Sequence, residues 1–157
     1  MVENDALIDG IGRAQGLAFS GDQDGARALY QGLWTEATRA EDNYQACVAA
    51  HFMAHAQVEP EAQLDWHLRA LRAAEAVDDG RVRAFYPSLY ANVADVYLRL
   101  SNLTRAREHI DKARATAHVL PDDHYGRMIR SLIERVSQTI ERDGSPDGQA
   151  GPDGPVI

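Results

Sequence analysis

The stretch YANVADVYLRLSNLTRAREHIDKARATAHVLP, residues 90–121, decides the fold that we predict for this chain. Its first half places large and small apolar residues at helical spacing, and its second half does the same after a polar turn. The first set is Tyr90, Val93, Ala94 and Tyr97, and the second is Ala106, Ile110 and Ala113. Small residues let two helices approach closely and large residues fill the space between them, so this spacing predicts an antiparallel helix pair.

The pattern resembles the tetratricopeptide repeat, whose W-x2-L-G-x2-Y half is followed by A-x3-F-x2-A and a closing proline, here Pro121. The resemblance covers residues 5–121 and is weaker in the two earlier pairs. Ala26, Gln63 and Ala106 stand at corresponding positions, 37 and 43 residues apart, whereas the family repeats every 34 residues or so. The resemblance implies an all-α fold, an α-solenoid of about three helix hairpins closed by a C-terminal capping helix.

Turn chemistry divides the chain into seven predicted helices, and no useful stretch alternates with the two-residue period of a strand. We expect helices over residues 4–19, 22–39, 43–57, 60–77, 82–100, 104–119 and 121–141. Pro87 could instead mark the start of the fifth helix, and Thr104 is the expected N-cap of the sixth. Residues 143–157 are rich in Gly and Pro, so a disordered tail is expected after a helical domain of residues 1–142.

The chain is acidic, with a net charge of −8, but its charge is divided unevenly. Residues 1–80 carry five Arg against fourteen Asp and Glu, whereas residues 81–142 carry eleven Arg and Lys against seven acids. Net negative charge argues against binding to nucleic acid or to an anionic membrane surface. The basic half could attract an acidic peptide, or the acidic half of a second copy in a homodimer. The basic residues are almost all Arg, a bias typical of GC-rich bacterial genomes.

Several absences in the sequence narrow the expected compartment. A single cysteine, Cys47, rules out an intrachain disulfide. The first nine residues are acidic, where an export signal needs positive charge, and no apolar run reaches the roughly 18 residues of a membrane span. We therefore expect a cytoplasmic protein. Cys47, Tyr30, Trp34, Trp66 and Tyr97 fall on helix-packing stripes and are expected in the core.

The family resemblance implies a groove lined by the first helix of each pair, with a protein or peptide as its partner. In that register, the expected contact residues are Tyr44, Phe52, His55, Asn92, Asp95, Arg99 and Arg127. The aromatic side chains would anchor apolar groups, Asn92 would bond to the backbone of the ligand, and the arginines would pair with acidic groups. No phosphate-binding glycine loop and no G-x-S-x-G elbow occur, so we expect a scaffold without catalysis or cofactor.

Three histidines support a rival hypothesis. His51 and His55 lie one turn apart on the third predicted helix, and His67 lies on the helix paired with it. Three facing imidazoles could hold a metal ion or line the pocket of a small-molecule-binding or tailoring protein. The alternative is a packed, hydrogen-bonded pair of His51 and His67, helped by acidic residues between 59 and 65, with His55 free in the groove. A pH-sensing role also follows, since imidazoles titrate near neutrality.

Overall fold

A computed structural model describes residues 2–77 and 80–144, and no strand occurs among them. This confirms the prediction of an all-α protein. The α-helices are α1 (Val2–Phe19), α2 (Gln23–Arg39), α3 (Asn43–His55), α4 (Pro60–Glu75), α5 (Tyr86–Arg99), α6 (Leu103–Thr116) and α7 (His124–Gly144). Two short 3-10 helices, η1 (Arg83–Phe85) and η2 (Ala117–Val119), precede α5 and follow α6. No helix of the described segments is long and apolar enough to cross a bilayer.

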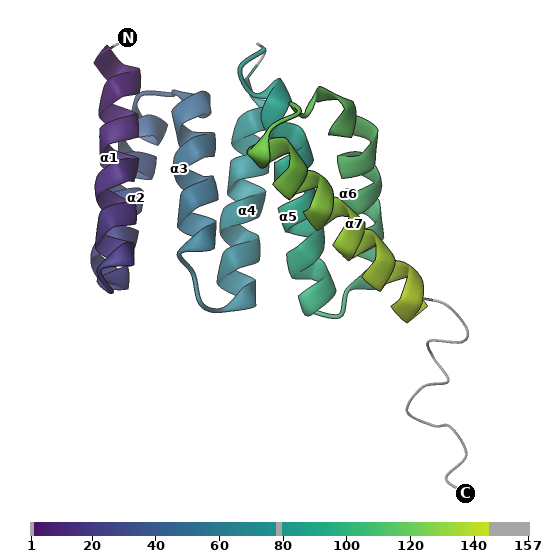
Figure 1. Cartoon of the computed structure of the whole chain (residues 1–157). Coiled ribbons are helices and arrows are strands. Elements are labelled where there is room, and N and C mark those ends of the chain that lie inside the picture. The colour runs from purple at the N-terminus through teal and green to yellow at the C-terminus, as the bar shows by residue number, and fades with distance from the viewer. Residues whose placement is uncertain (1, 78–79, 145–157) are drawn as a thin grey trace, which may run out of the picture.

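The helices follow one another in space in the same order as in the sequence (Figure 1). From α1 to α6, each helix packs against the next, so that α1 pairs with α2, α3 with α4, and α5 with α6. Helix α7 departs from this row and lies obliquely against both α5 and α6. As a result α7 reaches back over the side of the row on which α3 and α5 lie, and this placement creates the site described below.

The same turn is used three times, between α1 and α2, between α2 and α3, and between α5 and α6. Each turn contains a residue with positive φ: Gly21 (96°), Glu41 (54°) and Ser101 (61°). The following residue is Asp22, Asp42 or Asn102. Its N–H donates to the carbonyl five residues earlier, at 2.8 to 2.9 Å, and its side chain caps the next helix. The left-handed backbone suits glycine and strains the other two residues.

Some boundaries differ from those predicted. Asn102, rather than Thr104, caps α6, because its Oδ1 accepts the N–H of Arg105 at 3.1 Å. The predicted fifth helix is two pieces, and Pro87 lies in the first turn of α5, where its missing N–H costs no hydrogen bond. Helix α7 continues to Gly144, two residues into the predicted tail, and the remainder of that tail lies outside the described residues.

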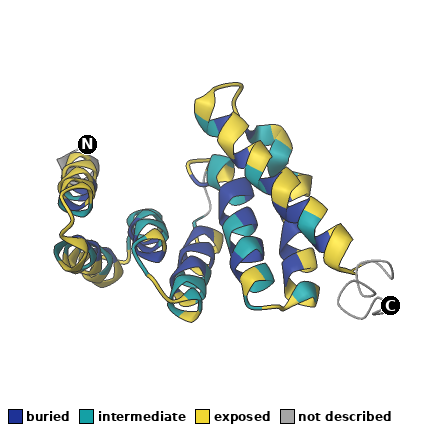
Figure 2. Ribbon diagram, turned by 60° about the horizontal axis from the view of Figure 1, so that its bottom comes forward, coloured by how far each residue is buried: buried dark blue, intermediate teal, exposed yellow. Residues whose placement is uncertain are grey.

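Alanines dominate the surfaces where the helices meet. One buried group extends from α1 to α5 and a second joins α5, α6 and α7. Fully buried alanines occur in six helices: Ala14, Ala26, Ala49, Ala50, Ala54, Ala70, Ala74, Ala91, Ala94, Ala106 and Ala113. Figure 2 shows these buried stripes on the sides where neighbouring helices face each other. Small side chains allow the helix axes to approach closely. Little space then remains between the helices, and a few larger residues fill it.

The larger residues predicted for the core divide into two groups. Cys47, Tyr30 and Trp66 are buried, as expected. Trp34 and Tyr97 are only half-buried, although each packs against a core group. Trp34 meets Trp66 edge to face, with ring centroids 5.5 Å apart, which joins α2 to α4. Aromatic pairs with this geometry contribute about 0.5–1.5 kcal/mol in addition to the stabilisation that comes from burying their surface.

Candidate functional site

Two adjoining cavities lie between α3, α5 and α7, and together we call them the α3–α5–α7 groove. The smaller has a volume of about 160 Å³ and its lining is Cys47, Val48, His51, Phe52, Phe85, Ser88, Leu89 and Tyr125. The larger, about 450 Å³, is lined by His51, His55, Ser88, Asn92, Tyr125, Met128, Ile129, Ser131, Leu132 and Arg135. Both cavities are lined by His51, Ser88 and Tyr125, so the two cavities adjoin at these side chains.

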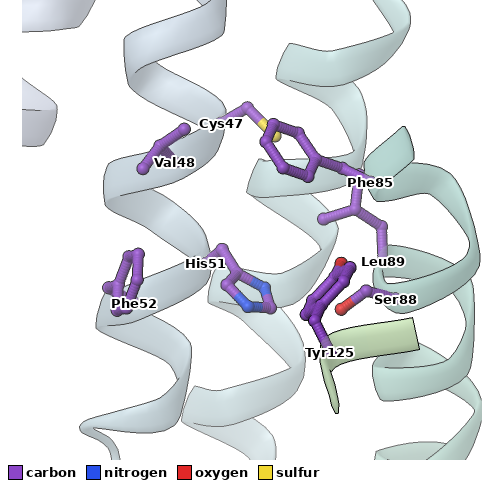
Figure 3. Close-up of a pocket in the computed structure, with 8 residues that line it drawn as sticks. All are labelled: Cys47, Val48, His51, Phe52, Phe85, Ser88, Leu89 and Tyr125. Atoms are coloured by element: carbon purple, nitrogen blue, oxygen red, sulfur yellow. The ribbon is translucent and has the colours of Figure 1, made fainter. Parts of the chain in front are cut away.

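The smaller cavity is the apolar end of the groove (Figure 3). The His51 ring points from α3 across to Tyr125 and Ser88, which come from α7 and α5. Burial raises the pKa of the Tyr125 hydroxyl, while a side-chain hydrogen bond with Ser88 lowers it. Burial also raises the pKa of the Cys47 thiol to about 12. A thiol with so high a pKa stays protonated, so Cys47 serves here as an apolar wall rather than as a nucleophile.

The larger cavity is the more polar end, and Arg135 is the arginine among its lining residues. Arg135 lines it and bonds through Nη1 to Oδ1 of Asp95 at 3.4 Å. Arg99 pairs with the other oxygen of Asp95, with Nε and Oδ2 3.6 Å apart. One carboxylate is therefore placed between two guanidinium groups. Asn92 donates from Nδ2 to the Ser88 carbonyl at 2.8 Å, so its amide is fixed in the wall of the cavity.

The structure brings together only part of the predicted contact set. Phe52 lines the smaller cavity, and His55 and Asn92 line the larger. The other predicted contacts line neither cavity: Tyr44, Asp95, Arg99 and Arg127.

Two of those residues have partners elsewhere. Tyr44 stacks on Phe85, with centroids 6.2 Å apart, and the Arg81 guanidinium lies 4.6 Å from its ring. Arg127 pairs with Asp122 at 3.7 Å near the start of α7. Tyr44 is therefore packed behind Phe85, which lines the smaller cavity, and Arg127 is paired near the start of α7 without lining either cavity.

Several of the lining residues that the sequence prediction missed come from α7. Tyr125, Met128 and Arg135 all line the larger cavity. Arg127 is the residue of this helix that the sequence predicted to reach the groove, and it lines neither cavity. The spacing of Tyr125, Met128, Leu132 and Arg135, at three, four and three residues, was the available signal, because such residues share one face of a helix.

His51, His55 and His67 form a histidine cluster between α3 and α4. One ring nitrogen of each lies within 4.8 Å of those of the other two. The His51 and His55 ring centroids are 4.7 Å apart, and those of His55 and His67 are 5.0 Å apart. One-turn spacing places the first two side by side on α3, and the packing of α4 against α3 brings up the third. The sequence predicted that His67 would face His51, whereas the approach of all three rings was its rival hypothesis.

Burial holds the cluster in its neutral form. Desolvation is the main cause that lowers the pKa of His51 to about 3 and that of His67 to about 2. Neighbouring imidazoles lower both pKa values further, and Arg99 adds to the effect on His67. The pKa of His55 is also lowered, by desolvation and then by Arg99, while Asp95 raises it. A neutral imidazole has a free lone pair, which is the form that binds metal.

Two nitrogens of the cluster have no hydrogen-bond partner. Nδ1 of His51 and Nδ1 of His67 are buried and unpaired among the residues that the structure describes. The acidic stretch expected to help does not reach them, since Asp65 pairs with Arg69 at 3.0 Å instead. The hydrogen-bonded histidine pair considered above is therefore incomplete at these atoms. Each unpaired buried group costs about 1–3 kcal/mol, so a ligand that supplied a partner would stabilise the fold.

The groove and the cluster are continuous, because His51 belongs to both and His55 lines the larger cavity. Their function is inferred from this geometry. No family model, no curated protein and no solved structure matches the chain.

Proposed function

We propose that the protein is a tetratricopeptide-like α-solenoid of three helix hairpins with α7 as its cap, and that it binds a protein or peptide segment without catalysing a reaction. The hairpins would be α1/α2, α3/α4 and α5/α6. Support comes from the order of packing and from Ala94 and Ala106, which are fully buried at the two positions where the repeat pattern requires small residues. In this arrangement the first helix of each later pair, together with α7, faces the ligand.

The observation that carries the proposal is the combination of an apolar cavity and a cationic rim in one groove. A cavity of about 150 Å³ lined by apolar side chains accommodates a benzene molecule, so the smaller cavity, at about 160 Å³, has room for one Phe or Leu side chain. Arg135 lies along the same groove at its polar end. A peptide with an apolar anchor followed by an acidic residue fits both ends.

Binding of such a peptide depends on competition for the arginines. The Asp95 carboxylate already forms ion pairs with Arg135 and Arg99. An acidic residue of the ligand would therefore compete with Asp95 for these guanidinium groups. These pairs are partly exposed, and ion pairs of that kind contribute about 0–1 kcal/mol. The apolar anchor therefore supplies most of the affinity, and the acidic residue supplies orientation and faster association.

The test is a random peptide library selected on the immobilised full chain, in buffer with a chelator, followed by affinity measurements on synthetic hits. We expect hits with an aromatic or aliphatic residue and an adjacent acid. Val48→Trp fills the smaller cavity and Arg135→Glu reverses the charge of the larger one. Each should weaken binding of the hits about tenfold or more.

The matched control is Arg39→Glu, which makes the same charge change on exposed α2, where Arg39 pairs only with its neighbour Glu36. This variant should bind the hits as the unaltered chain does. An absence of enriched peptides, or hits that bind equally well to both groove variants, would remove the groove as the ligand site.

A further inference from the structure

We propose that His51, His55 and His67 form a three-histidine site for a divalent transition-metal ion of the Zn²⁺ type. The inference stands apart from the peptide-binding proposal, because it rests on side chains between α3 and α4 and not on the shape of the groove. It assigns a role to two imidazoles, those of His51 and His67, whose buried Nδ1 atoms have no partner among the described residues.

The distances suit metal binding after a small closure of the side chains. A tetrahedral ion with ligand nitrogens about 2.0–2.1 Å away holds those nitrogens about 3.3 Å apart. The three candidate nitrogens already lie within 4.8 Å of one another. The exposed His55 side chain is free to rotate toward the other two, and the His51 and His67 rings, with centroids 5.8 Å apart, would also have to move closer.

The unpaired nitrogens indicate that the cluster lacks a component. His67 is only 3% exposed. Its Nδ1 and the Nδ1 of His51 have no hydrogen-bond partner within the described segments. An apolar residue at either position would fill the same space without that cost. A metal ion satisfies both imidazoles at once, since it accepts the lone pair that each neutral ring presents.

The choice of ion follows from the ligands and from access. Three imidazoles and no thiolate favour Zn²⁺, Cu²⁺ or Ni²⁺ over Mg²⁺ and Ca²⁺, which require oxygen ligands. His51 and His55 border the larger cavity, which gives the ion a path from solvent. The fourth position is left for water or for a ligand in the groove, the arrangement typical of three-ligand zinc sites.

The charge near the cluster is positive on balance, and Asp95 offsets part of it. Arg99 acts unfavourably on His55 and His67, and a cation would feel the same repulsion. Asp95 acts in the opposite direction on His55 and is tied to Arg99 by an ion pair at 3.6 Å. The carboxylate therefore offsets part of the guanidinium charge beside the site, and the lone pairs of the three imidazoles must supply the remaining affinity for a divalent ion.

The experiment uses the full chain without an affinity tag, freed of metal by a chelator that is then removed. Titration calorimetry with Zn²⁺ should give one equivalent of tight binding, and Mg²⁺ should give none. His55→Ala should weaken Zn²⁺ binding at least tenfold, because it removes a ligand at an exposed position where the fold does not depend on the side chain. His124→Ala, an exposed histidine at the start of α7, is the matched control and should leave binding unchanged.

A second readout needs no variant. The chain has six histidines, and Zn²⁺ should shift the imidazole nitrogen resonances of three of them in nuclear magnetic resonance spectra. Perturbation of His51, His55 and His67 supports the site. Weak binding of several ions, equal binding in His55→Ala, or resonance shifts confined to His118 and His124 would overturn it. Peptide binding is measured in chelator, so the two proposals can fail separately.

Discussion

Arg135 of α7 donates a hydrogen bond to the carboxylate of Asp95 on α5, with Nη1 and Oδ1 3.4 Å apart. The same carboxylate pairs with Arg99 one turn along α5. A single acid thus links α7 to α5 and holds two cations at the open end of the groove. Its side chain is only 19% exposed, which makes it the least accessible member of this group.

Asp95→Asn should free both arginines while preserving the shape of the side chain. Because the arginines are about half exposed, we expect stability to fall by no more than about 1 kcal/mol. Affinity for acidic peptides should rise, since the ligand no longer competes with Asp95. Urea denaturation and peptide titration at low and high salt measure the two effects. Weaker binding of an acidic peptide would contradict this role for Asp95.

Glu41→Gly and Ser101→Gly should each stabilise the protein. Both residues adopt positive φ at a helix-to-helix turn, where Gly21 occupies the equivalent position. Left-handed backbone costs a residue with a side chain about 1–2 kcal/mol, partly offset by the greater freedom of glycine in the unfolded chain. We expect a net gain of about 0.5–1 kcal/mol in urea denaturation. Ala40→Gly is the control, because Ala40 has a φ of −82°, and it should bring no gain.

Gly126→Ala should destabilise the start of α7. A Cβ atom at this position would overlap the carbonyl oxygen of Pro121, and the Gly126 N–H already donates to Oδ1 of Asp123 at 2.8 Å. Forcing extra volume into such a contact costs about 1–3 kcal/mol. Gly32→Ala provides the comparison, since nothing lies within 4 Å of its Cβ position. That variant should gain about 0.5–1 kcal/mol from helix propensity. Thermal unfolding of the pair gives the contrast directly.

Stability should fall as pH drops below 6.5. The pKa of His67 is lowered from 6.5 to about 2 on folding, so between these values the unfolded chain binds a proton that the folded chain does not. Stability then decreases with falling pH, and one unit below 6.5 a histidine of this kind contributes a loss of about 1.4 kcal/mol. The loss continues down to the low folded pKa.

The measurement is urea denaturation in chelator at several pH values from 7.5 to 5. His67→Phe removes one titrating group and keeps a large ring, so its profile should be flatter than that of the unaltered chain. His124→Ala should give the unaltered profile. If the free energy of unfolding changed with pH by the same amount in the unaltered chain and in His67→Phe, His67 would not be a source of the pH dependence.

The sequence predicted the helices and the adjacency of His51 and His55 because both depend on local spacing, whereas the approach of His67 depends on the packing of α4 against α3. One-turn separation places His51 beside His55 in any α-helix. It predicted the groove less well. Arg135 and Tyr125 reach the groove only because α7 folds back over α5, and no periodicity within α7 fixes that direction. The N-cap of α6 was misplaced because Thr104 and Asn102 are both good caps, and the turn geometry at Ser101 decides between them.

The sharing of His51 between the groove and the histidine cluster has a thermodynamic consequence. Any occupant that shifts its ring alters the affinity of the cluster for an ion, and the ion must alter the affinity for that occupant by an equal factor. In these two proposals the binding events are coupled through the imidazole of His51, which borders the groove and belongs to the cluster. Peptide binding by this protein would then depend on the concentration of the metal ion.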